Sequence, residues 1–274
     1  MLEPEDFINQ SSSTWCKGCS FHNVLTALSQ MLSTRVTDLS KINVISGIGC
    51  SSRLPLYLNT FGMHTLHGRA IPIAVGARLS RPDIPVIVTA GDGDLFSIGL
   101  SHFVHAARKN FKMMVLCMDN GMFAMTKNQS SPTSSTGHRG SLTPQGKIEE
   151  PMNLIDFSIA CDATFVARTI AADQIHMIDT LTKAFDHDGF AFVHIITPCQ
   201  TFDKSSLLSD INYRTIDINN DLFHNPADKL SALKFSTMPL SYDKDMKTKI
   251  PIGVFWKCLK PVFELSIQKP PALN

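Results

Sequence analysis

Short runs of apolar residues alternate with longer amphipathic stretches along the chain as far as about residue 204. The apolar runs, which we predict to be strands, are 42–46, 85–90, 113–118, 163–167 and 191–197. The amphipathic stretches, which we predict to be helices, lie near 20–31, 68–80, 96–109, 152–161 and 173–187. Runs that are apolar at every position are typical of strands buried on both faces of a parallel sheet. The alternation therefore predicts an α/β fold, with a mostly parallel sheet and helices on both faces.

Two segments fall outside this alternation. Residues 127–150 are rich in Ser, Thr, Gly and Gln and are predicted to form a long loop, and loops of that length are usually functional or disordered. Residues 204–274 are predicted to form an extended, proline-bearing C-terminal tail. Within it, the stretch 250–256 is too apolar for a free terminus, so we expect it to pack on the core or on a partner.

Composition narrows the range of partners and locations. A hydrophobic content of 43% and a charged content of 18% suit a chain with a sizeable core. The net charge of +1 gives no electrostatic footprint for nucleic acid. The acidic N-terminus lacks the features of a signal peptide, and no apolar run approaches the length of about 18 residues that a membrane span needs. We therefore expect a cytoplasmic protein without nucleic-acid or membrane partners.

Four of the seven cysteines stand at positions where a fold of this kind would bring them together. Cys16 and Cys19 are separated by two residues, whereas Cys50 and Cys199 each follow a predicted strand. Four thiolates suit either a cubane iron–sulfur cluster or a structural zinc ion, and these residues alone leave both open. Cys117, Cys161 and Cys258 lie in apolar surroundings and are predicted core residues; an odd total argues against a disulfide framework.

A second group of polar residues follows two strands that a single crossover helix would make neighbours. Gly91-Asp92-Gly93-Asp94 ends one strand and precedes a helix, and Asn120 ends the next strand. The glycines permit a tight turn, and a helix N-terminus suits an anion such as a diphosphate. Carboxylate, amide and carbonyl oxygens are ligands for magnesium. Because the Rossmann and Walker glycine patterns are absent, we predict a metal–diphosphate site at this strand-end crevice.

These motifs resemble a known family. Gly91-Asp92-Gly93 followed by Asn120 resembles the thiamine diphosphate motif, and Trp15-Cys16-Lys17-Gly18-Cys19 resembles the cysteine motif in the β subunit of 2-oxoacid:ferredoxin oxidoreductases. The resemblance covers roughly residues 10–205, and continues more weakly in the tail through Pro251 to Trp256. It also includes the following motifs: Gly47-Ile48-Gly49-Cys50-Ser51-Ser52-Arg53, His67-Gly68-Arg69-Ala70, Thr126-Lys127-Asn128-Gln129-Ser130-Ser131-Pro132-Thr133 and Pro198-Cys199-Gln200-Thr201-Phe202.

The resemblance implies a thiamine diphosphate-binding fold and assigns roles to individual residues. It implies that Asp92, Asn120 and the main-chain carbonyl of Met122 bind magnesium. The residues implied to hold a [4Fe–4S] cluster are Cys16, Cys19, Cys50 and Cys199. Those implied to contact the cofactor are Gly49, Ser51, His67, Gly91, Asp92, Gly93, Asp94, Asn120 and Met122. The implied domains are 1–203, which binds thiamine diphosphate and the cluster, and 204–274, a C-terminal extension packing on the core or the partner subunit.

Three side chains are candidates for the reaction itself. Arg53 is a candidate for binding the substrate carboxylate or a phosphate, His67 for contacting the cofactor or substrate, and Lys127 for neutralising phosphate or coenzyme A. Three positions depart from the family pattern. Ser20 and Asn128 replace glycines, which puts the local turns in doubt, and Arg53 stands where lysine is frequent but keeps the positive charge.

The implied activity is the coenzyme A-dependent oxidative decarboxylation of a 2-oxoacid, with 2-oxoglutarate favoured and pyruvate as the other candidate. Electrons would pass through the cluster to ferredoxin. The implied partner is an α subunit, or a fused α/γ subunit, which carries the glutamate that activates thiamine. Two alternatives remain open: a non-oxidative thiamine-dependent decarboxylase or synthase, and a zinc-stabilised assembly subunit without turnover.

Overall fold

The structure is a computed structural model that describes residues 2–203, 208–238 and 249–267. Its described residues form one eight-stranded sheet with the order β2-β1-β3-β4-β8-β7-β10-β9. All neighbouring strands run parallel, except that β10 runs antiparallel to β7. The strands are β1 Asn43–Ser46, β2 Phe61–His64, β3 Val86–Ala90, β4 Met113–Asp119, β7 Phe165–Ile170, β8 Phe190–Ile196, β9 Thr215–Asp217 and β10 Ile250–Lys257. The predicted α/β class is confirmed.

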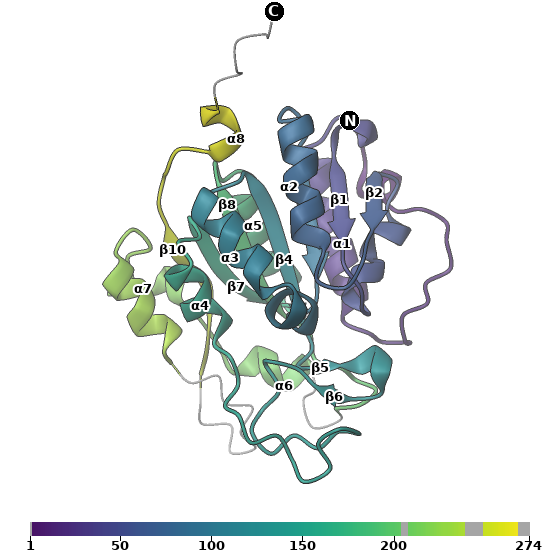
Figure 1. Ribbon diagram of the computed structural model, residues 1–274, viewed down its shortest axis with the longest axis vertical. Coiled ribbons are helices and arrows are strands. Elements are labelled where there is room, and N and C mark those ends of the chain that lie inside the picture. The colour runs from purple at the N-terminus through teal and green to yellow at the C-terminus, as the bar shows by residue number, and fades with distance from the viewer. Residues whose placement is uncertain (1, 204–207, 239–248, 268–274) are drawn as a thin grey trace, which may run out of the picture.

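Helices cover both faces of this sheet (Figure 1). Helices α1 (Phe21–Ser33) and α5 (Gln174–Phe185) pack on one face of the sheet, in a core that includes Leu28 and Val193. On the other face lie α2 (Ala70–Ser80), α3 (Leu100–Lys109), α4 (Leu154–Ala160) and α7 (Lys229–Ser236), in a core around Phe103 and Phe192. Both cores draw on alternate residues of the same central strands, which explains why those strands are apolar at every position.

Shorter elements connect these layers. A small antiparallel pair, β5 (Met122–Phe123) and β6 (Gln129–Ser130), opens the segment predicted as a long loop. A π-helical turn, η4 (Asp94–Ile98), leads into α3. The remaining short helices are η1 Pro4–Phe7, η2 Leu39–Lys41, η3 Ser51–Tyr57, η5 Ala124–Thr126, α6 Leu208–Tyr213, η6 Ile218–Asn220 and α8 Phe263–Ser266. Among the helices in these described ranges, none has the length and apolar content that a bilayer crossing requires.

The prediction of an extended tail beyond residue 204 was wrong. Described parts of this segment fold into α6, β9, α7, β10 and α8, and β10 joins the main sheet between β7 and β9. The residues Ile250, Ile252 and Phe255 of β10 are buried. The apolar stretch therefore packs on the core, which was one of the two predicted alternatives. Pro251 is tolerated because the pairing with β7 begins only at Gly253.

Candidate functional site

The carboxyl ends of four neighbouring strands form the edge of the sheet where the predicted site residues gather. β1, β3, β4 and β8 end at Ser46, Ala90, Asp119 and Ile196, and the predicted residues follow each of them directly. The β5–β6 pair lies at the same edge (Figure 1). Two cavities open there. This is the position where parallel α/β sheets bind ligands, because the loops leaving adjacent strands separate at their carboxyl ends.

The first cavity, of about 350 Å³, brings together the residues predicted to contact the cofactor. All of them line it: Gly49, Ser51, His67, Gly91, Asp92, Gly93, Asp94, Asn120 and Met122. They come from four separate loops, so the fold places side by side residues that are far apart in the sequence. The binding roles of these residues remain predictions.

Two buried carboxylates share one hydroxyl beside this cavity, and one of them, Asp92, lines it. Asp92 is 1% exposed and Asp119 is 3% exposed, and the hydroxyl of Thr133 lies 2.6 Å from Asp92 Oδ2 and 2.8 Å from Asp119 Oδ1. Burial, with the nearby charge of Asp119, raises the pKa of Asp92 to about 7. For Asp119 burial acts in the same direction, but the hydrogen bonds from His194, Thr133 and the Gly121 amide bring its pKa below the usual value. A bound cation would offset the repulsion between these two acids.

Close packing around the glycines leaves no room for larger residues. A Cβ atom on Gly93 would lie 2.2 Å from the ring of Phe123, and one on Gly91 would lie 3.1 Å from Ser51 Oγ. Gly49 adopts a φ of 137°, in the region that favours glycine. Phe123 and Ser51 can therefore pack against the backbone at Gly93 and Gly91, and Gly49 allows the turn after β1.

His67 is held at the cavity by a buried acid. Its Nδ1 lies 2.5 Å from Asp94 Oδ1, which also accepts hydrogen bonds from the amides of Ile48 and Gly68. Asp94 is buried, whereas the side chain of His67 is 37% exposed. Burial raises the pKa of Asp94, and these hydrogen-bond donors act against that shift. The contact fixes Nδ1 toward the protein, which leaves Nε2 available to a ligand.

The second cavity, of about 290 Å³, collects the four predicted ligand cysteines, and its lining includes Cys16, Cys19, Cys50 and Cys199. The indole of Trp15 donates a 2.7 Å hydrogen bond to the carbonyl of Cys50 and closes one side. Burial raises the pKa of the Cys19 thiol to about 11, and the three neighbouring cysteines add to this effect. Among the residues that the structure describes, no three Cys, His, Asp or Glu side chains are spaced to hold a single metal ion. All four predicted ligand cysteines thus line one cavity.

The departures from the family pattern are accommodated. Ser20 has an ordinary φ of −63°, is buried, and its hydroxyl lies 3.5 Å from the carbonyl of Pro198, which it can reach as a donor. Asn128 has a left-handed φ of 67°, a conformation that asparagine tolerates better than most residues, and its amide donates to the carbonyl of Arg139. No turn has to be rebuilt at either position.

The two cationic candidates occupy different places. Arg53 lines the second cavity, and its guanidinium donates to the carbonyl and hydroxyl of Thr14 at 3.0 and 2.7 Å. Its positive charge also opposes the rise in pKa that burial causes at Cys50. Lys127 is exposed, has a left-handed φ of 64°, and lines neither cavity, although Thr126 beside it lines the first.

Several residues of the site were missed. Thr133, Ser134 and Lys147 all come from the segment 127–150, which folds back over Asp92 and Gly121. The Lys147 ammonium is buried and donates to the carbonyls of Pro132 and Ser134 at 3.1 and 2.8 Å. Two signals were available, the family-like motif 126–133, which contains Thr133, and the length and composition of the segment, but neither gave these residues a role.

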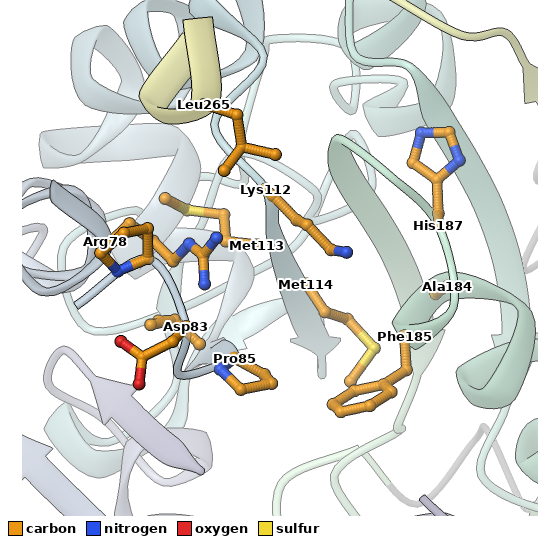
Figure 2. A pocket seen from close by; sticks show the side chains of 12 residues that line it. Arg78, Asp83, Pro85, Lys112, Met113, Met114, Ala184, Phe185, His187 and Leu265 are labelled. Carbon is orange, nitrogen blue, oxygen red and sulfur yellow. The ribbon is translucent and has the colours of Figure 1, made fainter. Parts of the chain in front are cut away.

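A further cavity lies at the opposite edge of the sheet, at the start of β3 and β4 (Figure 2). Its principal charged groups are already paired. Arg78 forms a 2.8 Å buried ion pair with Glu264 of α8, and Lys112 lies 2.5 Å from Asp188. The amide of Lys112 also donates to Glu264. This recess therefore serves to dock the C-terminal helix α8 and offers no free charge to a ligand.

Comparison with known proteins gives a consistent result. The family model described as "Thiamine pyrophosphate enzyme, C-terminal TPP binding domain" matches residues 47–195. A "2-oxoacid:ferredoxin oxidoreductase subunit beta" from Sulfolobus sp is 36% identical, over 93% of this chain and 85% of its own length. A "2-oxoglutarate synthase subunit KorB" from Methanocaldococcus jannaschii is 35% identical, over 93% of this chain and 91% of its own length.

A solved structure is similar over nearly the whole chain. It is the 2-oxoglutarate:ferredoxin oxidoreductase from Magnetococcus marinus with 2-oxoglutarate, coenzyme A and succinyl-CoA bound. The TM-score is 0.89 at 36% sequence identity, and the match covers 96% of this chain and 87% of the other.

Proposed function

We propose that this chain, which belongs to the β subunits of the 2-oxoacid:ferredoxin oxidoreductases, binds thiamine diphosphate through magnesium and holds a [4Fe–4S] cluster beside it. The observation that carries this proposal is the wall that the two cavities share, because Cys50, Asn120, Ala124 and Met125 line both of them. A cofactor in the first cavity and a cluster in the second would be direct neighbours, as electron transfer between them requires.

The first cavity fits a magnesium–diphosphate group. The Asp92 carboxylate, the Asn120 amide and the Met122 carbonyl are oxygen donors of the kind that magnesium prefers. A magnesium ion beside Asp92 would favour its ionised form and offset the raised pKa that burial and Asp119 cause. Gly91 and Gly93 line this cavity at the start of a helical segment, whose N-terminus favours an anion such as the diphosphate.

The second cavity fits a cluster better than it fits zinc. A zinc ion needs four ligands at about 2.3 Å from a single point, whereas each thiolate of a cubane cluster binds a different iron. The four cysteines line a cavity, and the name of a similar protein specifies ferredoxin, a partner that takes up single electrons. This favours the cluster over the zinc-stabilised assembly subunit.

The proposed reaction converts a 2-oxoacid, coenzyme A and two oxidised ferredoxins into an acyl-coenzyme A, carbon dioxide, a proton and two reduced ferredoxins. We favour 2-oxoglutarate as the substrate, because the names of similar proteins specify it. Thiamine diphosphate, when bound, supplies the electron sink that allows carbon dioxide to leave. In this chain Asp94 orients His67 toward the cavity, and Arg53 offers a cation at the cavity of the cysteines.

The thiamine-activating acid is proposed to come from the partner subunit. Among the described residues, no glutamate lines either cavity. A complete site therefore needs an α subunit, or a fused α/γ subunit, against this edge of the sheet. Ferredoxin is the proposed electron acceptor, and it would approach the side of the second cavity, where Cys16 is exposed.

The test is an assay of the complex of this chain with its partner subunit, purified without oxygen. We expect iron and sulfide in the complex, a brown colour, and reduction of a dye acceptor that depends on coenzyme A and is fastest with 2-oxoglutarate in a panel of 2-oxoacids. Decarboxylation without acceptor reduction would instead support the non-oxidative enzyme. A colourless complex that contains zinc would support the assembly subunit.

A further inference from the structure

Three charged or ionisable side chains are fully enclosed in the middle of the sheet, next to the proposed magnesium site. Asp119, His194 and Arg168 are 3%, 1% and 0% exposed and stand on the neighbouring strands β4, β8 and β7. In the sheet register His194 lies directly across from Arg168 on one side. Burying such groups is costly unless each is paired, so a network of this kind in a central sheet calls for a reason.

The geometry fixes the direction of the hydrogen bonds along this network. Arg168 Nε, which can only donate, lies 3.1 Å from His194 Nδ1. A neutral His194 must therefore carry its hydrogen on Nε2, which donates to Asp119 Oδ2 at 2.9 Å. Arg168 is held in turn by the carbonyl of Pro251 at 3.2 Å and by the ring of Phe255. The three side chains thus connect β10 to the end of β4.

The other oxygen of Asp119 controls the turn that carries two proposed magnesium ligands. Asp119 Oδ1 accepts a 2.8 Å hydrogen bond from the amide of Gly121, which stands between Asn120 and Met122. It also lies 2.8 Å from the Thr133 hydroxyl, which reaches Asp92. The Asp119 carboxylate therefore contacts His194 through Oδ2. Through Oδ1 it contacts the turn at Gly121 and the Thr133 hydroxyl that reaches Asp92.

We propose that Arg168, His194 and Asp119 form a positioning chain that holds the turn 119–122 in the orientation that coordinates magnesium. The inference rests on the proposed function, since it assumes that Asn120 and Met122 are the ligands. None of the three lines either cavity. They act by fixing Asp119, and a rotation of its carboxylate would release the Gly121 amide and the Thr133 hydroxyl together.

The chain offers a matched control for this inference. His187 is buried to the same degree, at 3% exposure, and its Nε2 lies 2.8 Å from the hydroxyl of Thr164. It lines the cavity at the opposite edge of the sheet, away from Asp92 and Asn120 (Figure 2). A substitution there removes a comparable buried hydrogen bond without touching the magnesium site.

The experiment measures the magnesium concentration that gives half-maximal binding of thiamine diphosphate, by calorimetry on the cofactor-depleted complex with the partner subunit. In His194→Asn the side chain is too short to reach both Asp119 and Arg168. This variant should raise the half-maximal magnesium concentration about tenfold or more, because a hydrogen bond to a charged group is lost. His194→Gln, whose amide can meet both Asp119 and Arg168, should stay close to the wild type. His187→Asn should lower the melting temperature without changing the magnesium requirement.

Three results would overturn the inference: an unchanged requirement in His194→Asn, an equal rise in His187→Asn, or no recovery in His194→Gln. If His194→Asn fails to fold, Arg168→Lys, which removes the Nε donor, takes its place. An unchanged magnesium requirement in Arg168→Lys, or an equal rise in His187→Asn, would then overturn the inference. A wild-type complex that binds no thiamine diphosphate would overturn the proposed function, and this inference with it. Normal wild-type binding with an unchanged variant would overturn the positioning chain alone.

Discussion

At the scale of single residues, the seven cysteines divide by position. Cys16, Cys19, Cys50 and Cys199 line one cavity, whereas Cys117 lies inside β4 and Cys161 ends α4. Cys258, just after β10, is half-buried, so its prediction as a core residue was wrong. The fold thus separates the cysteines into four that line a cavity and others that do not. Free cysteine behaves as a small apolar residue when buried, so the second group needs no metal.

This division predicts different results for the same substitution. Cys199→Ala should lower the iron content of the complex and abolish 2-oxoacid-dependent dye reduction, because one iron of the cluster loses its thiolate. Cys161→Ala should leave both unchanged. Iron determination on the two purified complexes is the measurement, and full iron occupancy in Cys199→Ala would remove that residue from the ligand set.

His187 gives a prediction for stability against pH. Burial, assisted by the charge of Lys257, lowers its pKa from 6.5 to about 4 in the folded protein. The unfolded chain therefore binds this proton at a higher pH than the folded chain does, and stability falls as the pH drops from about 6.5 toward about 4. His187→Gln should lose less stability than the wild type on going from about pH 7 to about pH 5, because it has no proton to take up. Denaturant melts at both pH values would test this; equal losses would contradict it.

How far single site residues could be predicted depends on where their partners lie. Asp92 and Asn120 could be inferred because each directly follows a strand, and neighbouring parallel strands end at one edge. Thr133 and His194 could not, because their roles arise from contacts with residues 41 and 75 positions away in the chain. Nothing in the local sequence around either residue specifies those contacts.

At the scale of elements, the segment 127–150 is an ordered cover over the site. The hydroxyl of Ser134 lies 2.5 Å from the carbonyl of Gly121, to which it donates, and the main chain of Lys147 bonds to Gly137 and His138. The ammonium of Lys147 then ties Pro132 and Ser134, the two neighbours of Thr133. Composition alone could not tell whether this loop is functional or disordered. In the structure the buried ammonium of Lys147 fixes it by binding main-chain carbonyls.

Lys147→Met should therefore loosen this cover. Hydrogen bonds to a charged group contribute about 1.5–3 kcal/mol each, and methionine fills the same space without donating. We expect faster amide hydrogen exchange in residues 130–137 and weaker binding of thiamine diphosphate, while α5 at the far face exchanges as before. Hydrogen exchange with mass spectrometry is the measurement. Unchanged exchange in 130–137 would show that the loop is held by its other contacts.

The elements that sequence patterns missed are those whose environment departs from the common rule. β2 is exposed at all four positions, so it carries no apolar run to detect. β10 contains Pro251 and Gly253, which ordinarily argue against a strand, and it shifts register between Val254 and Trp256. The central strands were predicted correctly because burial on both faces imposes an apolar side chain at each position.

At the scale of the whole molecule, the edge that carries both cavities also exposes apolar side chains. Ile48, Met125 and Phe202 line the cavities and are 38%, 49% and 44% exposed, and Leu66, beside His67, is 74% exposed. A contiguous apolar patch on the surface often marks an interface, whereas single exposed apolar residues are normal. We therefore propose this edge as the place where the partner subunit binds.

This chain alone should therefore be inactive. Purified without its partner, it should show negligible 2-oxoacid-dependent dye reduction, and addition of the α subunit should restore turnover, because we propose that the thiamine-activating acid comes from that subunit. Met125→Glu should weaken the association of the two subunits in sedimentation experiments, since it places a charge in the apolar rim. Leu79→Glu, at a position that is 48% exposed on α2, is the matched control and should associate normally. Full turnover by the isolated, cofactor-loaded chain would mean that the activating acid lies within residues 1–274, and equal association of both variants would place the interface elsewhere.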